Sequence, residues 1–500
     1  MYDRACQVPG VSLRELFPDA VFLGADDIRV TGCSGDSRAC REGDVFVALC
    51  GATADGHDFV GDAVARGAAA VLAERPLFAA GVPICCVPDT RVAYGRLCQA
   101  LVGNPSQRLK VIGVTGTNGK TTTSHLIASI LSTAGYPAGV LGTLGYYDGS
   151  VVAPANWTTP PAPVLAAWLA RIEAGGCTHA VVEVSSHALA QSRVEGVRFD
   201  VACVTNVRHD HLDFHLTQKN YLAAKARLFS HLAPEGVAVI NVDDGGSASC
   251  AARYDGPMLS VSIDSAAEVT ATPLTQFTSE QTFLLHVGSD SVPVRTTLIG
   301  RHNVHNCLVA AAVGLVYGID LADIVRGLEA VSTVPGRLER LECGQPFGVF
   351  VDYAHTPDAL AGCLDTLRAV TGGRLICVFG AGGDRDRLKR PAMGKAVEAR
   401  ADVAVLTNDN PRGEDPQAIL SQILAGFRDR ESVHIIEDRA EAIRFALSRA
   451  RAGDCVVIAG KGHEEHQTIG SRRLYFDDRE VARQWLYEST GVDELLRAAA

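Results

Sequence analysis

A glycine-rich loop carries the clearest chemistry in this sequence. Residues 113–123 read Gly-Val-Thr-Gly-Thr-Asn-Gly-Lys-Thr-Thr-Thr, between a short apolar run and a segment with helical spacing. Glycines let backbone N–H groups approach a polyphosphate, Lys120 places a cation over the β- and γ-phosphates, and Thr121 offers a hydroxyl to Mg²⁺. Val114 stands where the strict P-loop pattern has its first glycine. We expect a nucleoside triphosphate to bind here, with a plain glycine turn as the alternative.

Three other polar positions follow apolar or helical segments. Glu183 ends an apolar run and could bind Mg²⁺ directly or through water, although by itself it fits a solvated strand end equally well. His211 lies between His209 and His215, but no cysteine flanks them at zinc-ligand spacing, and a hard cation near phosphates prefers oxygen ligands. One histidine near a divalent ion is therefore favoured over a structural zinc site or a metal-free turn. For Lys225, the helical spacing alone favours a solvent-exposed lysine.

These residues need a scaffold of alternating strands and helices. Short apolar runs rich in β-branched residues alternate with helical segments, which predicts an α/β fold with mostly parallel sheets. The turn signals near residues 103–107 and 334–336 divide the chain into three expected domains, at 1–108, 109–336 and 337–500. In the last block, each apolar run is followed by a polar cluster, and in an open parallel sheet such clusters form a ligand-facing edge. Those clusters begin at Asp352, Gly380, Asn408 and Ala459.

Bulk properties narrow the class of protein. The 500 residues exceed one core, and the net charge of −11 argues against a general nucleic-acid binder. The sequence contains no run of 18 apolar residues and no signal peptide at its start, so we expect a cytoplasmic protein that does not enter a membrane. The 15 cysteines form no C-x-x-C pair and suit small buried side chains better than disulfides.

Taken together, the motifs resemble the Mur ligases of peptidoglycan synthesis. The resemblance spans nearly the whole chain and rests on segments in family order: residues 115–122, 183–187, 206–213, 223–225, 300–306, 335–337 and 352–357. It implies three α/β domains: an N-terminal UDP-binding domain, a central P-loop ATPase and a C-terminal Rossmann-like domain. Asp36-Ser-Arg38 and the stretch from Glu183 to Arg193 resemble the tripeptide synthetases of that family.

The resemblance also implies a nucleotide site. ATP would be held by Gly116, Thr117, Asn118, Gly119, Lys120, Thr121, Thr122, Asn303, Arg337 and Asp352. Mg²⁺ would be bound by Thr121, Glu183, His211 and Lys225, with Lys225 carbamylated so that it supplies an anionic oxygen instead of a repelling ammonium. The catalytic residues would be Lys120, Glu183, His211 and Lys225.

Two further substrates follow from the resemblance. UDP-MurNAc-L-Ala-D-Glu would contact Ser37, Thr158, Thr159, Ser185, Gln191 and Arg193. The amino acid would contact Arg385, Asp409, Asn410, Pro411, Arg412, Gly460 and Glu464. In the family, Asp409-Asn-Pro-Arg412 accompanies meso-diaminopimelate, and a guanidinium suits the second carboxylate that L-lysine lacks. Without the family, this motif could equally be a turn.

The implied activity is amide formation through an acyl phosphate, in a protein that we expect to be a monomer by default. Alternatives are an L-lysine-adding synthetase, a folylpolyglutamate synthetase, which should lack the N-terminal domain, and a P-loop regulatory protein without ligase activity. One departure concerns the two threonines at 158 and 159. The family commonly has Asn directly before them, whereas here Trp157 holds that place and Asn156 precedes it.

Overall fold

The computed structural model describes residues 10–51, 53–77 and 80–498, with side chains to residue 489. By its internal contacts the chain separates into two compact units. The first holds the chain up to Thr115 together with residues 136–202 and 224–237, and the second holds residues 116–135, 203–223 and the chain from 238 onward. No helix of the described residues is long and apolar enough to cross a membrane.

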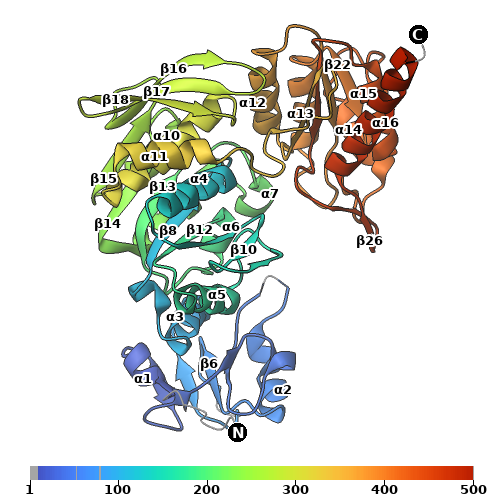
Figure 1. The fold of residues 1–500 in the computed structure, drawn as a ribbon. Helices are drawn as coiled ribbons and strands as arrows, with labels where there is room; N and C mark the ends of the chain where they lie inside the picture. Colours follow the sequence, from blue (N-terminus) through green and yellow to red (C-terminus); the bar gives the residue numbers. More distant parts are fainter. Residues whose placement is uncertain (1–9, 52, 78–79, 499–500) are drawn as a thin grey trace. The chain divides into compact units, whose positions relative to one another are not determined.

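The N-terminal part of the first unit is a five-stranded sheet. In sheet order its strands are β2 (Val21–Leu23), β7 (Ile84–Cys86), β6 (Ala70–Ala73), β5 (Val45–Val47) and β4 (Cys33–Ser34). All neighbours are parallel except β2 and β7. Helix α3 (Thr90–Leu101) begins at Asp89, whose carboxylate caps two N–H groups of the first turn, and it packs against α5 (Ala162–Ala174; Figure 1).

A larger sheet carries the glycine-rich loop. Its central strands are parallel and, apart from the exposed Lys110 at the start of one of them, buried on both faces, as their apolar runs predict. In sheet order the strands are β11 (Val152–Ala153), β10 (Gly145–Tyr147), β9 (Ala138–Gly142), β12 (His179–Glu183), β8 (Lys110–Thr115), β13 (Phe199–Val204), β14 (Leu232–Asn241), β15 (Met258–Ser262), β16 (Val269–Gln276), β17 (Gln281–Val287) and β18 (Asp290–Thr296).

Three helices pack together in the second unit. Helix α4 (Lys120–Thr133) follows the loop and contacts α10 (Arg301–Val316) and α11 (Leu321–Ala330; Figure 1). Leu126, Ile127, Ile130 and Leu131 of α4 are buried, as the helical spacing predicts. Gly135 follows α4 with a φ of +82°, so the predicted stop signal is confirmed.

The C-terminal part of the second unit is a sheet with helices on both faces. Its strands run β19 (Glu339–Arg340), β20 (Gly348–Asp352), β24 (Cys455–Ala459), β21 (Leu375–Phe379), β22 (Val403–Leu406) and β23 (His434–Ile435). All but β19 are parallel to their neighbours. Helices α12 (Pro357–Arg368), α13 (Lys389–Glu398) and α14 (Pro416–Leu424) bury one face, and α15 (Arg439–Arg449) and α16 (Asp478–Ala498) bury the other.

The predicted fold class is confirmed: the chain is mixed α/β with mostly parallel sheets. The fourteen cysteines that the structure describes are all free thiols.

Candidate active site

The glycine-rich loop joins β8 to α4, as its sequence predicts. Asn206 anchors the loop from outside: its side-chain Oδ1 accepts the Asn118 N–H at 2.9 Å and its carbonyl accepts the Thr117 N–H at 2.8 Å. The Lys120 ammonium donates to the carbonyls of Gly116 (2.8 Å) and Thr117 (3.0 Å), which curls it over the loop. This is the strand–loop–helix arrangement that cradles phosphates, with its cation in place.

A buried asparagine pair supports the same loop from α10. Asn303 donates to the Ile299 carbonyl at 2.8 Å and accepts from Asn306 at 3.0 Å. The side-chain Oδ1 of Asn306 lies directly against Gly119, which has a φ of +87° and leaves no room for a Cβ atom. The predicted nucleotide residue Asn303 therefore reaches the loop through Asn306.

Arg337 also reaches the loop. Its Nη2 lies 3.3 Å from the Thr121 hydroxyl, and its guanidinium stacks 4.5 Å from the ring centroid of Tyr353. Asp352 shapes the backbone beside it, because its carboxylate accepts the N–H groups of Leu338 and Ala354, both at 2.7 Å. The structure thus brings Arg337 to the loop, with Asp352 holding the turn that presents it.

His211 also belongs to the second unit. It has a φ of +54°, an uncommon conformation for a residue other than glycine, and its Nε2 is 3.4 Å from Asp210. Its ring lies 6.3 Å from that of Tyr221, whose hydroxyl contacts the Thr117 hydroxyl at 3.0 Å. The positive φ is a strained feature of the kind that is concentrated at functional sites.

Glu183 is buried, so the alternative of a solvated strand end is wrong. Only 1% of the residue is exposed, and Thr143 holds its carboxylate with an N–H to Oε1 and a hydroxyl to Oε2, both at 3.0 Å. The Thr143 hydroxyl also lies 3.1 Å from that of Thr158. Glu183 pairs in the sheet with Val114, two residues before Gly116.

The predicted dipeptide residues form one network in the first unit. Thr159 donates its hydroxyl to the Glu183 carbonyl at 2.7 Å and accepts the Ser185 N–H at 2.9 Å. Arg193 donates to the Thr159 carbonyl at 2.9 Å and grips the Gln191 amide oxygen with Nε (3.0 Å) and Nη2 (2.7 Å). Ser37, on a separate 3₁₀ turn, has no hydrogen bond to this network among the described residues.

The position of Lys225 corrects the prediction made from its helical spacing. It lies on α8 (Gln218–Ala226), where the helical pattern favoured a solvent-exposed side chain, yet only 1% of the residue is exposed. A lysine is almost never fully buried without charged or polar company, so its burial sets it apart from an ordinary surface lysine.

The polar clusters of the last block meet at one edge of its sheet, as predicted. Asn410 donates to Glu464 Oε2 at 2.8 Å, and Lys461 lies 3.2 Å from Asn410 Oδ1 and 3.3 Å from the same Glu464 oxygen. Gly460 has a φ of +119°, and a Cβ atom there would lie 2.6 Å from Asp409 Oδ2. Glycine is therefore required for these two loops to approach each other.

The two predicted arginines lie on loops that touch. The Gly383 N–H donates to the Asn410 carbonyl at 2.8 Å, and Arg412 Nη1 donates to the Gly383 carbonyl at 2.8 Å. Arg385 is exposed and donates to the neighbouring Asp384 carbonyl at 2.9 Å. Arg412 has a φ of +50°, and the backbone of the buried Pro411 packs against Gly383.

Sequence reasoning missed Thr143, Asn206 as an anchor, and Lys461. Each acts across the fold: Thr143 and Glu183 are 40 residues apart, and Asn206 and Asn118 are 88 apart. Spacing along the chain cannot reveal such pairs. Lys461 did carry a signal, because it stands between the predicted residues Gly460 and Glu464.

Two other features of the structure lie apart from these residues. Cys50, Asp55 and His57 bring their ligand atoms within 4.8 Å of one another, and the three histidines of residues 209–215 form no such group. His57 Nε2 accepts the Glu74 N–H at 3.0 Å, so Nδ1 carries the proton donated to Asp55 at 2.6 Å. Hydrogen bonds within the protein thus already use both nitrogens.

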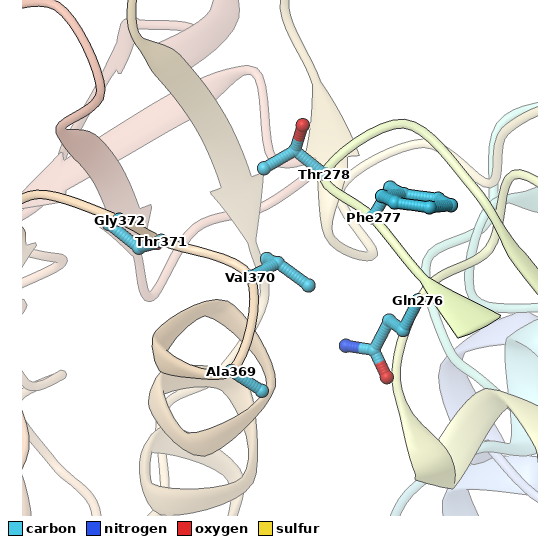
Figure 2. Close-up of a pocket in the computed structure, with 7 residues that line it drawn as sticks. All are labelled: Gln276, Phe277, Thr278, Ala369, Val370, Thr371 and Gly372. Carbon is cyan, nitrogen blue, oxygen red and sulfur yellow. The ribbon is translucent and has the colours of Figure 1, made fainter.

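The second feature is a cavity of about 400 Å³ between the β16–β17 turn and the end of α12 (Figure 2). It is lined by Gln276, Phe277, Thr278 and residues 369–372, none of which carries a titratable side chain.

The fold and the loop together define a phosphate-loop enzyme with an added Rossmann-like sheet. Profiles of three protein domains match the chain: the Mur ligase family catalytic domain at residues 29–100, the Mur ligase middle domain at 114–314, and the Mur ligase glutamate ligase domain at 336–462. The chain belongs to the Mur ligase family.

Individual relatives agree with this assignment. The UDP-N-acetylmuramoyl-L-alanyl-D-glutamate–2,6-diaminopimelate ligase of Syntrophomonas wolfei is 43% identical over 93% of this chain and 96% of its own length. The ligase of that name from Gloeobacter violaceus is 45% identical over 92% and 94%. A solved structure of a ligase with this name has a TM-score of 0.69 at 36% identity, covering 96% of this chain and 99% of its own. MurF from Acinetobacter baumannii, at 24% identity and a TM-score of 0.62, shares the fold.

Proposed function

We propose that this protein is an ATP-dependent ligase that joins meso-diaminopimelate to UDP-MurNAc-L-Ala-D-Glu, a step of peptidoglycan synthesis. The observation that carries the proposal is the pairing, at one sheet edge, of a carboxylate held by an amide with an arginine loop: Glu464 with Asn410, and Arg412 beside Gly383. The names of the relatives point to the same amino acid.

The nucleotide part of the proposal rests on the loop. ATP would lie with its phosphates against residues 116–122, with Lys120 as the cation, and with Asn303, Arg337 and Asp352 beside them. For Mg²⁺ the donor set fits, because the Thr121 hydroxyl and the Glu183 carboxylate are the oxygen ligands that this ion prefers. Thr143 already holds the Glu183 carboxylate in a fixed orientation. When bound, Mg²⁺ would neutralise phosphate charge, and His211 and a carbamylated Lys225 are the proposed ligands of a second ion.

The dipeptide part rests on Arg193 and its neighbours. Burial lowers the pKa of Arg193, but the guanidinium remains charged at neutral pH. Gln191 and the Thr159 carbonyl hold its guanidinium. The hydroxyl groups of Thr158, Thr159 and Ser185 belong to the same network and suit a carboxylate and its peptide, and Ser37 would contact the uracil. These residues would hold the D-glutamate carboxylate still for phosphoryl transfer.

The amino-acid part explains the choice of diaminopimelate over lysine. Glu464 uses Oε2 for both of its hydrogen bonds in the described part of the chain, so Oε1 faces no protein donor there and suits an ammonium. Among the described residues the Arg412 guanidinium donates through Nη1 alone, which leaves Nη2 and Nε for a carboxylate. L-lysine has no second carboxylate, so Arg412 would face it unpaired, at a cost of about 1–3 kcal/mol.

The reaction follows from these placements. The γ-phosphoryl group passes to the D-glutamate carboxylate, which gives an acyl phosphate and ADP. The amine of diaminopimelate then attacks the acyl carbon, and phosphate leaves from the tetrahedral intermediate. The chain's contribution is to position the reactants and to offset charge, through Lys120 at the phosphates and through Arg193 and Arg412 at the carboxylates.

One assay tests the proposal. Phosphate release is measured with UDP-MurNAc-L-Ala-D-Glu and either meso-diaminopimelate or L-lysine, in wild type and in Arg412→Ala. We expect phosphate release to require the dipeptide and diaminopimelate. Arg412→Ala should raise the diaminopimelate KM roughly 30- to 150-fold, which corresponds to a loss of about 2–3 kcal/mol of binding free energy. Arg428→Ala, an exposed arginine of the same sheet domain, is the matched control and should match wild type. A preference for lysine would contradict the substrate, and release without any acceptor would favour a nucleotide hydrolase.

Three broader points belong to the same proposal. The domains are 1–108, 109–336 and 337–500, the protein acts in the cytoplasm, and it acts as a monomer. Size-exclusion chromatography with light scattering tests the last of these.

A further inference from the structure

Lys461 is a buried lysine among the polar clusters at the edge of the C-terminal sheet, where we propose that the amino acid binds. It follows β24 and Gly460, and none of its side chain is exposed. Its ammonium lies 3.2 Å from Asn410 Oδ1 and 3.3 Å from Glu464 Oε2. Removing a lysine charge from water is costly, so a buried lysine is retained only where its contacts compensate.

The contacts of Lys461 determine which way the Asn410 amide points. Oδ1 of Asn410 accepts from two groups that can only donate, the Lys461 ammonium at 3.2 Å and the Thr468 N–H at 2.9 Å. The amide nitrogen must therefore face the other way, where it donates to Glu464 Oε2 at 2.8 Å. Asn410 is 2% exposed, so water offers no alternative partner.

Lys461 also balances charge in this buried region. Asp409 and Glu464 carry negative charges near it, and Arg439, paired with Asp478 at 2.7 Å, donates to the carbonyl of Ala459, two residues before Lys461. Burial alone would raise the pKa of Asp409, but the positive charges of Lys461 and Arg439 hold it below its usual value. Without Lys461, the carboxylates of Asp409 and Glu464 would lack a nearby ammonium, and Glu464 would lose a donor that fixes its Oε2.

We propose that Lys461 is a positioning residue: through Asn410 and Glu464 it fixes the acceptor oxygen that receives an ammonium group of the incoming amino acid, without itself touching that substrate. The proposal rests on the function proposed above for this edge. It predicts that loss of Lys461 weakens amino-acid binding selectively, because ATP and the UDP-dipeptide are bound by other residues.

The test is a double-mutant cycle with Lys461→Met, which keeps the length of the side chain, and Glu464→Gln. We expect each single variant to raise the diaminopimelate KM at least tenfold, with the ATP KM within twofold of wild type. Lys461→Met removes the contact that orients the Glu464 carboxylate, and Glu464→Gln removes the carboxylate itself. The diaminopimelate KM of the double variant should therefore be no higher than that of the more severe single variant. Lys461→Gln keeps an N–H donor and should recover part of the loss. Lys395→Met, an exposed lysine on α13, is the control and should match wild type.

Several results would overturn the proposal. An unchanged diaminopimelate KM in Lys461→Met, multiplicative effects in the double variant, or an ATP KM raised equally would each contradict selective positioning. If Lys461→Met fails to fold, Lys461→Gln carries the same comparison. A crystal structure of Lys461→Met with the Asn410–Glu464 hydrogen bond intact would also refute it. The crystallographic result does not depend on which substrate the enzyme uses. If the wild type shows no diaminopimelate-dependent phosphate release, the proposed function is refuted instead.

Discussion

Thr143 holds both oxygens of the Glu183 carboxylate, with its backbone N–H on Oε1 and its hydroxyl on Oε2, each at 3.0 Å. Two donors on one residue fix the plane of the carboxylate. The Glu183 side chain therefore loses its conformational entropy when the protein folds, and not when a ligand binds.

Glu183→Gln tests this arrangement with an isosteric change. The amide cannot supply an anionic oxygen, so we expect kcat to fall roughly 100-fold or more and the Mg²⁺ concentration for half-maximal rate to rise. Thr143→Val, which removes only the hydroxyl, should weaken the Mg²⁺ response by about 10-fold. Thr143→Ser keeps both donors and should match wild type. A Mg²⁺ titration of phosphate release measures all three, and an unchanged titration in Glu183→Gln would exclude Glu183 as a ligand.

Lys225 offers a second test, because its burial requires a chemical reason. We expect Lys225→Ala to lose activity without rescue by bicarbonate, since no amine remains to carry a carbamate. Lys225→Arg keeps the charge but cannot be carbamylated, so it should be equally inactive. Lys219→Ala, an exposed lysine of the same helix, is the control. Carbon-13 NMR of protein in labelled bicarbonate reports the carbamate directly, and full activity of Lys225→Ala would disprove the role.

The two glycines at the ends of α4 form a matched pair. Gly119 and Gly135 have φ of +87° and +82°, so alanine at either position is strained by about 1 kcal/mol. Only at Gly119 does the new Cβ atom collide with Asn306, whereas Gly135 has open space around it. We expect Gly119→Ala to raise the ATP KM more than tenfold, and Gly135→Ala to lower the melting temperature slightly with ATP binding intact. Equal ATP KM values in the two variants would show that the Asn306 contact is irrelevant.

Acid stability depends on a buried histidine. Burial, together with Lys110, lowers the pKa of His179 to about 4, although Asp200 opposes the shift. In the unfolded chain, His179 takes up a proton below about pH 6.5, whereas in the folded chain it does not do so until about pH 4. The free energy of unfolding therefore falls by about 3 kcal/mol as the pH drops through that window. His179→Gln should flatten this part of the pH profile in urea unfolding. His434→Gln, at an exposed site, should leave the slope unchanged.

Much of the fold could be predicted because its signals are local. Runs such as residues 375–379 and 455–458 are short, β-branched and apolar, which suits strands buried on both faces. The loop and Gly135 are likewise recognised from neighbouring residues. Lys225 was placed wrongly because its burial depends on elements distant in sequence, and no helical pattern records it. Thr143 was missed for the same reason, because it acts on Glu183 from 40 residues away, whereas Lys461 could have been found from its place between Gly460 and Glu464.

The site residues remain predictions with different structural support. One hydrogen-bond network contains Thr158, Thr159, Ser185, Gln191 and Arg193. A second group, at the edge of the C-terminal sheet, contains Asn410, Gly460 and Glu464. Ser37 and Arg385 have only local contacts in the described chain. Trp157, which replaces the usual asparagine, is 46% exposed and accepts a hydrogen bond from Tyr146 through its carbonyl at 2.7 Å. That backbone contact does not depend on the side chain at 157.

Arg412 stands in a backbone conformation that glycine would adopt with less strain, at a φ of +50°. The position therefore sets two selective pressures against each other. Arg412→Gly should relieve up to about 1 kcal/mol of backbone strain, while removing the Nη1 hydrogen bond to Gly383 and the guanidinium that we propose distinguishes diaminopimelate from lysine. Backbone strain alone would favour glycine here, and under the proposed function the composition of the cell wall is the trait that keeps the arginine.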